Sequence, residues 1–256
     1  MKKIVLKKKL LVLTSLAILL SAASWLVYTK VLDQSLCLAA SQENTAAVAR
    51  LLKRGANPNA VGVVPAPDCD CDTDPLHALS LAVTNPPASC WEQMGPVPIS
   101  YKEAGMGTAA LLLRAGADVN ARDKDGSTAL MLARTPRMVK FLLAHGAKVD
   151  LRNKNGETAL LQDAGSDRGI LNALVSGSAD VNARDKRGRT VLMIAVSSSS
   201  DDAADRKSTA GLAKALTAAG ANVNFRDDQG KTALGYALDS KQTDSVRFLK
   251  HIGARL

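Results

Sequence analysis

The residues best suited to chemistry in this chain are four cysteines and one histidine in its first third. They are Cys37, Cys69, Cys71, Cys90 and His77. Thiolate and imidazole ligands suit a tetrahedral zinc ion, so Cys69, Cys71, His77 and Cys90 form a candidate metal set. The Cys-x-Cys pair at Cys69 and Cys71 is also a candidate redox centre. Neither spacing is that of a standard zinc finger.

The same four thiols could instead form disulfides, for which four cysteines allow three connectivities. A bond between Cys69 and Cys71 would close a ring too small for the usual disulfide geometry. The aspartates from Asp68 to Asp74 resemble a calcium loop, but there is no glycine at the sharp turn. Leu79 stands at the twelfth position, where such loops need an acid. We therefore expect disulfides rather than a metal ion.

The first 30 residues predict export. They contain six lysines and no acid, and residues 10–28 are nineteen positions without a charge. An apolar stretch of about 20 residues can cross a bilayer, with the basic flank left in the cytoplasm. The alternative is a cleaved signal peptide with small residues at 21–23 as its cleavage site. Either way we expect an extracytoplasmic, periplasmic-side protein, anchored in the inner membrane or released.

The rest of the chain has an ordinary charge balance. Of the formal net charge of +9, the leader contributes +6, which leaves +3 over residues 31–256. This excess is too small to favour a nucleic-acid partner. Aromatic residues make up only 3% of the chain, which favours an Ala/Leu-rich helical array over a large β-sheet core.

Two short motifs recur along the chain at a period that predicts stacked helical units. Gly-x-Thr-Ala/Val-Leu begins at Gly126, Gly156, Gly188 and Gly230. Gly-Ala-x-Val/Pro-Asn/Asp begins at Gly55, Gly116, Gly146 and Gly220, with a variant at Gly177. The first motif is spaced by 30 and then 32 residues, which is typical of a solenoid. We expect the threonines of the first motif to begin helices and Gly146, Gly177, Gly220 and Gly253 to end them in a left-handed conformation.

These repeats resemble ankyrin repeats. Thr128-Ala-Leu-Met-Leu-Ala133, Thr158-Ala-Leu160 and Asp74-Pro-Leu-His-Ala78 look like variants of the Thr-Pro-Leu-His-x-Ala helix start of that family. The resemblance implies an all-α solenoid of helix–turn–helix units with β-hairpin fingers, following the N-terminal hydrophobic helix. We expect about six repeats over residues 33–256, with inserts near 61–73, 84–106 and 197–208.

The resemblance also bears on the cysteines. It aligns Cys37 with the histidine of the helix start, beside the finger that contains Cys69 and Cys71. We therefore expect one disulfide from Cys37 to that finger and a second from the finger to Cys90.

The fingers carry the candidate binding residues. Short polar stretches recur in register from Arg122, Arg152, Arg184 and Arg226. The candidates for partner binding are Arg122, Lys124, Arg152, Lys154, Arg184, Lys186 and Arg226. Each charge alone could be an ordinary solvated group, but as a set they line the concave surface where such arrays bind partners.

The function implied by the resemblance is protein binding. We expect no catalytic residue and no cofactor, because the chain contains no nucleophile elbow, P-loop or paired catalytic carboxylates. One specific form of this function is the neutralisation of a toxic protein in the envelope. The alternative is a metal- or redox-active protein that uses the cysteine-rich insert.

Overall fold

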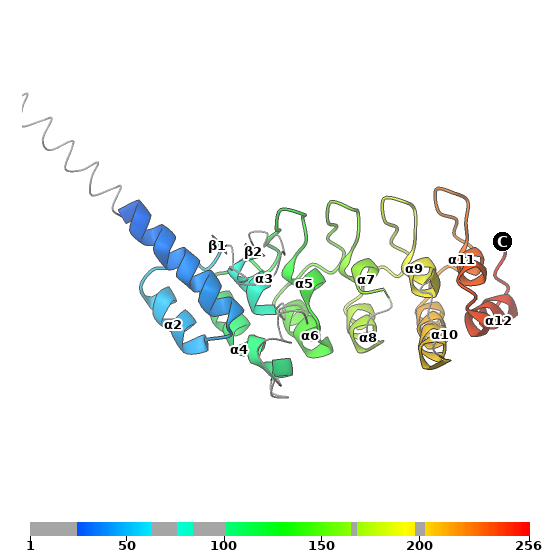
Figure 1. Cartoon of the computed structure of the whole chain (residues 1–256), viewed down its shortest axis with the longest axis horizontal. Coiled ribbons are helices and arrows are strands. Elements are labelled where there is room, and N and C mark those ends of the chain that lie inside the picture. Colours follow the sequence, from blue (N-terminus) through cyan, green and yellow to red (C-terminus); the bar gives the residue numbers. More distant parts are fainter. Residues whose placement is uncertain (1–24, 63–75, 84–100, 165–167, 198–202) are drawn as a thin grey trace, which may run out of the picture. The chain divides into compact units, whose positions relative to one another are not determined.

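The computed structural model describes residues 25–62, 76–83, 101–164, 168–197 and 203–256 (Figure 1). The chain divides into two compact units. Unit 1 comprises residues 1–82, 86–97 and 107–117, and unit 2 comprises residues 83–85, 98–106 and 118–256. Helices predominate among the described residues of both units, as the repeat pattern predicts.

Unit 1 packs helices around a small apolar core. A helix over residues 25–41 precedes α2 (Thr45–Lys53), β1 (Val61–Gly62), β2 (Leu76–His77), α3 (Ala78–Val83) and most of α4 (Tyr101–Arg114). The two strands pair antiparallel, with Val61 opposite His77. The Asn44 side chain begins α2 by accepting a hydrogen bond from the backbone N–H of Ala47 at 3.0 Å. Leu36, Cys37, Val48 and Leu112 are fully buried.

The first helix differs from the expected one. The repeat pattern predicts a helix start near Gln34, but residues 25–41 already form one continuous helix. No glycine or proline interrupts this stretch, so nothing in it ends the helix early. Cys37 consequently lies in the second half of the helix and not at its beginning.

The expected N-terminal hydrophobic helix falls largely on residues 1–24, outside the described residues. Among the helices that are described, none combines the length and the apolar character needed to cross a bilayer. Several apolar side chains at the start of helix 25–41 are exposed: Trp25, Leu26, Val27 and Tyr28 have exposed fractions of 53–65%.

Unit 2 is built from pairs of helices. The inner helices are α5 (Ala129–Leu132), α7 (Ala159–Gln162), α9 (Val191–Ser197) and α11 (Ala233–Asp239). The outer helices are α6 (Pro136–Ala144), α8 (Arg168–Ser176), α10 (Ala203–Ala218) and α12 (Thr243–His251). Figure 1 shows the inner helices as one row and the outer helices as a second, with four loops projecting on the inner side. We call these loops, residues 120–128, 150–158, 182–190 and 224–232, the finger row.

The core of unit 2 lies between the two rows of helices. Each helix contributes leucine, valine or methionine side chains to it, and alanines let neighbouring helices approach closely. Its largest fully buried side chains are Leu142, Leu160, Leu174, Leu192, Met193, Leu216, Leu249 and Val139. Because the contacts run from one helix pair to the next, each pair depends on its neighbours for burial.

Most of the predicted helix starts are confirmed. Thr158, Thr190 and Thr232 accept hydrogen bonds from the backbone N–H three residues later, at 3.3–3.4 Å. Thr128 has the extended backbone of a helix start but makes no such bond. Thr135, which the repeat pattern does not single out, begins α6 in the same way and is followed by Pro136 at the first helical position.

One predicted helix end is wrong. Gly55, Gly116, Gly146, Gly220 and Gly253 adopt φ angles of 81–94°, but Gly177 does not have a positive φ. The left-handed residue of that repeat is Ser178, with φ of 66°. Gly177 is needed for another reason: a Cβ atom there would lie 2.5 Å from Leu143 Cδ1. Ser178 thus takes the place of the turn glycine, in register with Gly146 of the preceding repeat, and Gly177 stands at the position of His145.

Two of the expected inserts are partly helical. Residues 101–106 of the insert near 84–106 belong to α4, and residues 203–208 of the insert near 197–208 belong to α10. Both helices begin among alanine, lysine and glutamate or arginine, which are strong helix formers. The expected insert near 61–73 begins with β1, and its remaining residues lie outside the described ranges.

Candidate protein-binding surface

Each finger is closed by a carboxylate or amide side chain at its fourth position. Asp227 Oδ1 accepts hydrogen bonds from the backbone N–H groups of Gln229 at 2.9 Å and Lys231 at 2.8 Å. Asp123, Asn153 and Asp185 make the equivalent two bonds in their own fingers. The turn is completed by Gly126, Gly156, Gly188 and Gly230, whose φ angles are 72–77°. Each finger is therefore a hydrogen-bonded turn of defined shape.

Backbone hydrogen bonds join the fingers to one another. The N–H of Lys154 donates to the carbonyl of Asp125 at 2.7 Å, and the N–H of Lys186 donates to that of Asn155 at 3.1 Å. The same bond joins Asp228 to Arg187 at 3.1 Å. Because each fingertip is fixed to the next, the finger row presents its side chains at set spacings.

The arginines of the finger row form a second set of bonds between fingers. Arg122 Nη1 donates to the carbonyl of Arg152 at 2.9 Å, and Arg152 Nη1 to that of Arg184 at 2.5 Å. Arg184 Nη2 donates to the carbonyl of Arg226 at 2.7 Å. The guanidinium groups of Arg152, Arg184 and Arg226 also donate to a glycine carbonyl of their own finger, at 2.7–2.9 Å. Cationic donors make strong hydrogen bonds, so these arginines hold the fingers together.

The lysines of the finger row are placed differently. Lys124, Lys154 and Lys186 are exposed at the tips of three successive fingers. In the fourth finger the corresponding residue is Asp228, which lies 4.0 Å from the Arg184 guanidinium. The structure thus divides the seven candidate binding residues into four arginines with an internal role and three lysines at the tips.

A buried polar cluster supports the fourth finger. Tyr236 Oη donates a hydrogen bond to Asp227 Oδ2 at 2.6 Å, and Lys231 Nζ lies 4.4 Å from the centre of the Tyr236 ring. Burial, followed by the bond to Asp227, raises the pKa of Tyr236 to about 12. Burial opposes ionisation of Asp227, but the Tyr236 bond and the backbone bonds outweigh it and lower its pKa. The finger is therefore closed by an ionised carboxylate at neutral pH.

A similar device supports the third finger. Asp185, which is 9% exposed, forms an ion pair with Arg189 at 2.7 Å in addition to its turn hydrogen bonds. The repeated Asp or Asn at the fourth finger position is visible in the sequence, directly after the arginine of each finger. This repeated Asp or Asn is the feature of the sequence that predicts the hydrogen-bonded turn of each finger.

The structure describes one of the cysteines. Cys37 is a buried free thiol whose Sγ lies 3.6 Å from the carbonyl oxygen of Ala60. Burial, and to a lesser extent the charge of Asp33, raises the pKa of Cys37 to about 11, so the thiol is un-ionised at neutral pH. Cys69, Cys71 and Cys90 lie outside the described residues, so their pairing stays a prediction.

The metal candidates fall on the same part of the chain. The backbone of His77 lies in β2, and its expected co-ligands lie outside the described ranges. Within those ranges, no group of three His, Cys, Asp or Glu side chains is arranged to hold a metal ion.

Comparison with known proteins agrees with this architecture. The family model "Ankyrin repeats (3 copies)" matches residues 102–185 and 161–256, together more than half of the chain. The crystal structure of EF0377, an ankyrin-repeat protein, aligns with a TM-score of 0.65 at 20% sequence identity. That alignment covers 86% of this chain and 98% of the other, and at this identity it shows a shared fold. A search of the curated proteins finds no match. The chain belongs to the ankyrin-repeat family.

Proposed function

We propose that this protein is a non-enzymatic interaction module that binds a protein partner through the finger row and the adjacent inner helices. The observation that carries the proposal is the pair of hydrogen-bond series that joins the fingers, through Lys154 N–H to Asp125 and through Arg122 to Arg152. A surface that is already ordered loses little conformational freedom on binding, so more of its contact energy appears as affinity. Ankyrin repeats generally bind protein partners, which supports the same proposal.

Within this surface, the lysines are the better candidates for direct contact. Lys124, Lys154 and Lys186 are exposed at successive tips, and the guanidinium groups of Arg122, Arg152 and Arg184 donate to the backbone of the neighbouring finger. A mixed row of lysine, aspartate and asparagine at the tips suits a polar partner surface with acidic groups. Such charges mainly influence the association rate and the choice of partner.

The proposed function includes a location for the repeats. We place the repeats outside the cytoplasm, anchored through residues 10–28 or released after cleavage, because six lysines precede an uncharged stretch. The exposed apolar side chains of residues 25–28 are consistent with a bilayer interface next to this helix. One partner that fits this location is a toxic protein of the envelope, which the module would neutralise by binding.

The test is a comparison of two charge-reversed variants of the full-length protein. Lys154→Glu with Lys186→Glu alters two fingertips, and Lys53→Glu with Lys148→Glu makes the same charge change at two exposed positions outside the finger row and the outer helices. Each is used to capture proteins from the membrane fraction of the source cell, and captured proteins are then titrated individually. We expect a partner whose affinity falls at least tenfold for the fingertip variant and less than twofold for the Lys53 and Lys148 variant. Equal affinities for both variants would overturn the proposal.

A further inference from the structure

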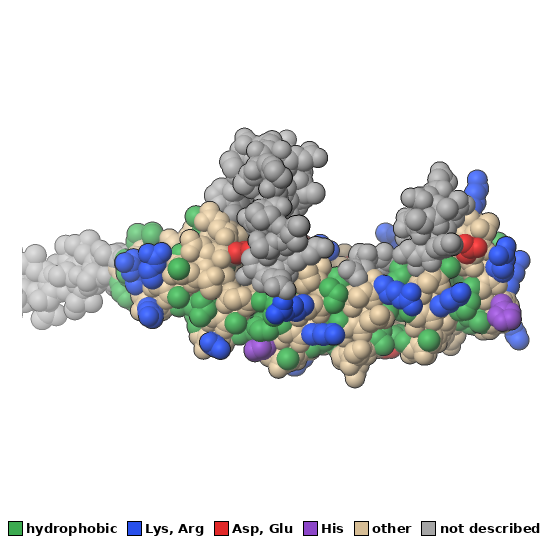
Figure 2. Space-filling view, turned by 90° about the horizontal axis from the view of Figure 1, so that it is seen from below, with side chains coloured by type: hydrophobic (Ala, Val, Ile, Leu, Met, Phe, Trp, Pro, Cys, Tyr) green, Lys and Arg blue, Asp and Glu red, His purple; other side chains and the backbone are tan. Residues whose placement is uncertain are grey.

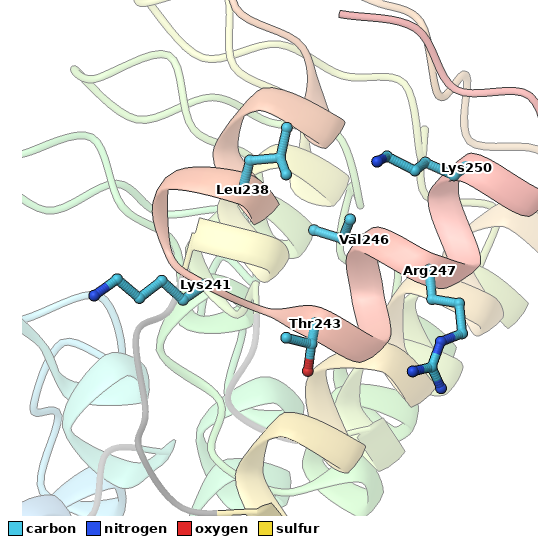
Figure 3. Close-up of a pocket in the computed structure, with 6 residues that line it drawn as sticks. All are labelled: Leu238, Lys241, Thr243, Val246, Arg247 and Lys250. Atoms are coloured by element: carbon cyan, nitrogen blue, oxygen red, sulfur yellow. The ribbon is translucent and has the colours of Figure 1, made fainter.

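A groove opens between α11 and α12, in the last helix pair of unit 2 (Figure 3). Its volume is about 490 Å³. Six residues line it: Leu238, Lys241, Thr243, Val246, Arg247 and Lys250. None of them belongs to the finger row, so the groove is separate from the surface proposed above.

The floor of the groove is apolar and reaches solvent. Figure 3 shows Leu238 at the end of α11 and Val246 on α12 on facing sides of the gap between the helices. Leu238 is 41% exposed, and Val246 is only partly buried. Covering such side chains removes apolar surface from water, which favours an apolar occupant.

The rim of the groove is cationic. Lys241, Arg247 and Lys250 are all exposed, and the ammonium groups of the two lysines form no ion pair with a described residue. The acid beside the groove is Asp244, whose carboxylate lies 4.0 Å from the Arg247 guanidinium. Figure 3 shows Lys250 extending toward Leu238 and Val246, whereas the Lys241 and Arg247 side chains start at the edges and point away from the gap. Because these side chains are long and exposed, a change of rotamer brings their charges to an occupant.

The positive charge continues along the outer helices. Among their described side chains the bases are Arg137, Lys140, Arg168, Lys214, Arg247 and Lys250, whereas the only acid is Asp244. Figure 2, which views this face, shows Lys and Arg side chains spread over it and few acidic ones. An acidic segment is therefore attracted to this side of unit 2 and held along it.

We propose that this groove is a second docking site, which binds an acidic, amphipathic segment of a protein partner. An apolar side chain of the segment lies between Leu238 and Val246, and its carboxylates pair with Lys241, Arg247 and Lys250. A free phosphate or other small anion would use only the cationic rim and leave the apolar side chains of Leu238 and Val246 exposed to water, so the apolar floor favours an occupant that also has an apolar side chain. The cationic rim disfavours a purely apolar or basic segment.

The experiment uses the full-length protein in neutral lipid nanodiscs and three labelled synthetic peptides of about 14 residues, or roughly four helical turns. The first contains Glu with Leu at every fourth position, the second replaces Leu with Ser, and the third replaces Glu with Lys. Fluorescence anisotropy measures each affinity. We expect the Glu/Leu peptide to bind at least tenfold more tightly than either of the other two.

Two variants locate the binding. Lys241→Gln with Lys250→Gln removes two rim charges, and Leu238→Ser removes part of the floor at an exposed position. Each variant should lower the affinity for the Glu/Leu peptide at least fivefold. The fingertip variant Lys154→Gln with Lys186→Gln makes the same charge change elsewhere and should bind within twofold of the unaltered protein. Circular dichroism confirms that each variant is folded. The two groove variants change different side chains, so if one of them does not fold, the other still tests the site.

Three outcomes would overturn the proposal. Equal binding of the Glu/Leu and Glu/Ser peptides would show general electrostatic attraction without a seated apolar side chain. Unchanged binding by both groove variants would place the site elsewhere. Anionic phosphatidylglycerol vesicles that bind through Lys241 and Lys250, when no peptide does, would identify a membrane surface as the occupant. None of these results bears on the finger row, because its own test measures a captured partner protein and not these synthetic peptides.

Discussion

At the scale of single residues, the repeat that ends at Ser178 is the least well formed of unit 2. The five other described turns of this kind have glycine in the left-handed conformation, whereas here a serine adopts φ of 66°. A side chain in this conformation costs roughly 1 kcal/mol relative to glycine. The adjacent Gly177 does not fill this role, because it lies one residue before the turn position and does not have a positive φ.

Ser178→Gly is therefore expected to stabilise unit 2. The relief of strain outweighs the greater freedom of glycine in the unfolded chain, and we expect a gain of about 0.5–1 kcal/mol in urea unfolding. Gly177→Ala should have the opposite effect, because its Cβ atom would lie 2.5 Å from Leu143 Cδ1. A loss of stability on Ser178→Gly would show that the serine side chain is itself needed at this turn.

A second residue-scale prediction concerns Asp150. At the equivalent positions, Asn120 and Asn182 each accept a backbone hydrogen bond from the next repeat and donate one to a glycine carbonyl. Asp150 accepts the bond from the Asp180 N–H at 3.0 Å, but an ionised carboxylate has no hydrogen to donate. Asp150→Asn can add a bond to the Ser178 carbonyl and should raise the unfolding free energy by about 0.5–1 kcal/mol. The converse change, Asn182→Asp, serves as the control and should lower it by a similar amount.

At the scale of elements, part of the structure of the finger row can be predicted from the sequence and part cannot. The Gly-x-Thr spacing predicts the inner helices and the turns of the fingers, because each depends on a few local residues such as Thr158 and Gly156. The spacing also predicts that Arg122, Arg152 and Arg184 lie in register. It does not tell whether a guanidinium extends outward or along the row, since that depends on carbonyls 30 or more residues away.

The helix boundaries have the same explanation. Helix 25–41 and α10 both extend further toward the N-terminus than the repeat pattern predicts, because the sequence before the expected start also favours a helix. The left-handed residue at Ser178 was missed because Gly177 beside it has the better propensity for that conformation. No sequence motif predicts the groove between α11 and α12, because Leu238 and Val246 come together only when the two helices pack against each other.

The bonds between fingers give a prediction for this element. Arg152→Gln shortens the side chain, so that it no longer reaches the carbonyls of Gly156 and Arg184. We expect a loss of about 1 kcal/mol, since these are charge-assisted bonds at an exposed site, and faster hydrogen exchange at the Lys186 amide. Lys154→Gln makes the same charge change without removing such a bond and should leave both quantities nearly unchanged. If the two variants behave alike, the arginine bonds do not stabilise the row.

At the scale of the whole molecule, the decisive property is that the helix pairs of unit 2 contact mainly their neighbours. The inner helix α7 lies between α5 and α9, whereas α12 contacts α10 and α11. In such an array, stability is a sum of terms for each repeat and for each interface between neighbours. A destabilising substitution in a central helix pair therefore affects the interfaces on both of its sides. A substitution in the pair α11 and α12 affects only one side of the array.

Two substitutions of similar size separate these cases. Leu160 on α7 and Leu249 on α12 are both fully buried, so changing either to alanine removes about the same apolar contact and should cost roughly 2–5 kcal/mol. We expect Leu160→Ala to lower hydrogen-exchange protection in α5, α7 and α9 together and to loosen the two fingers beside them. Leu249→Ala should lower protection in α10, α11 and α12 while α5 and α6 keep theirs, because no direct contact carries the loss that far. If both variants lowered protection uniformly across unit 2, the unit would unfold as one cooperative body, and the groove at α11 and α12 could not loosen independently of the finger row.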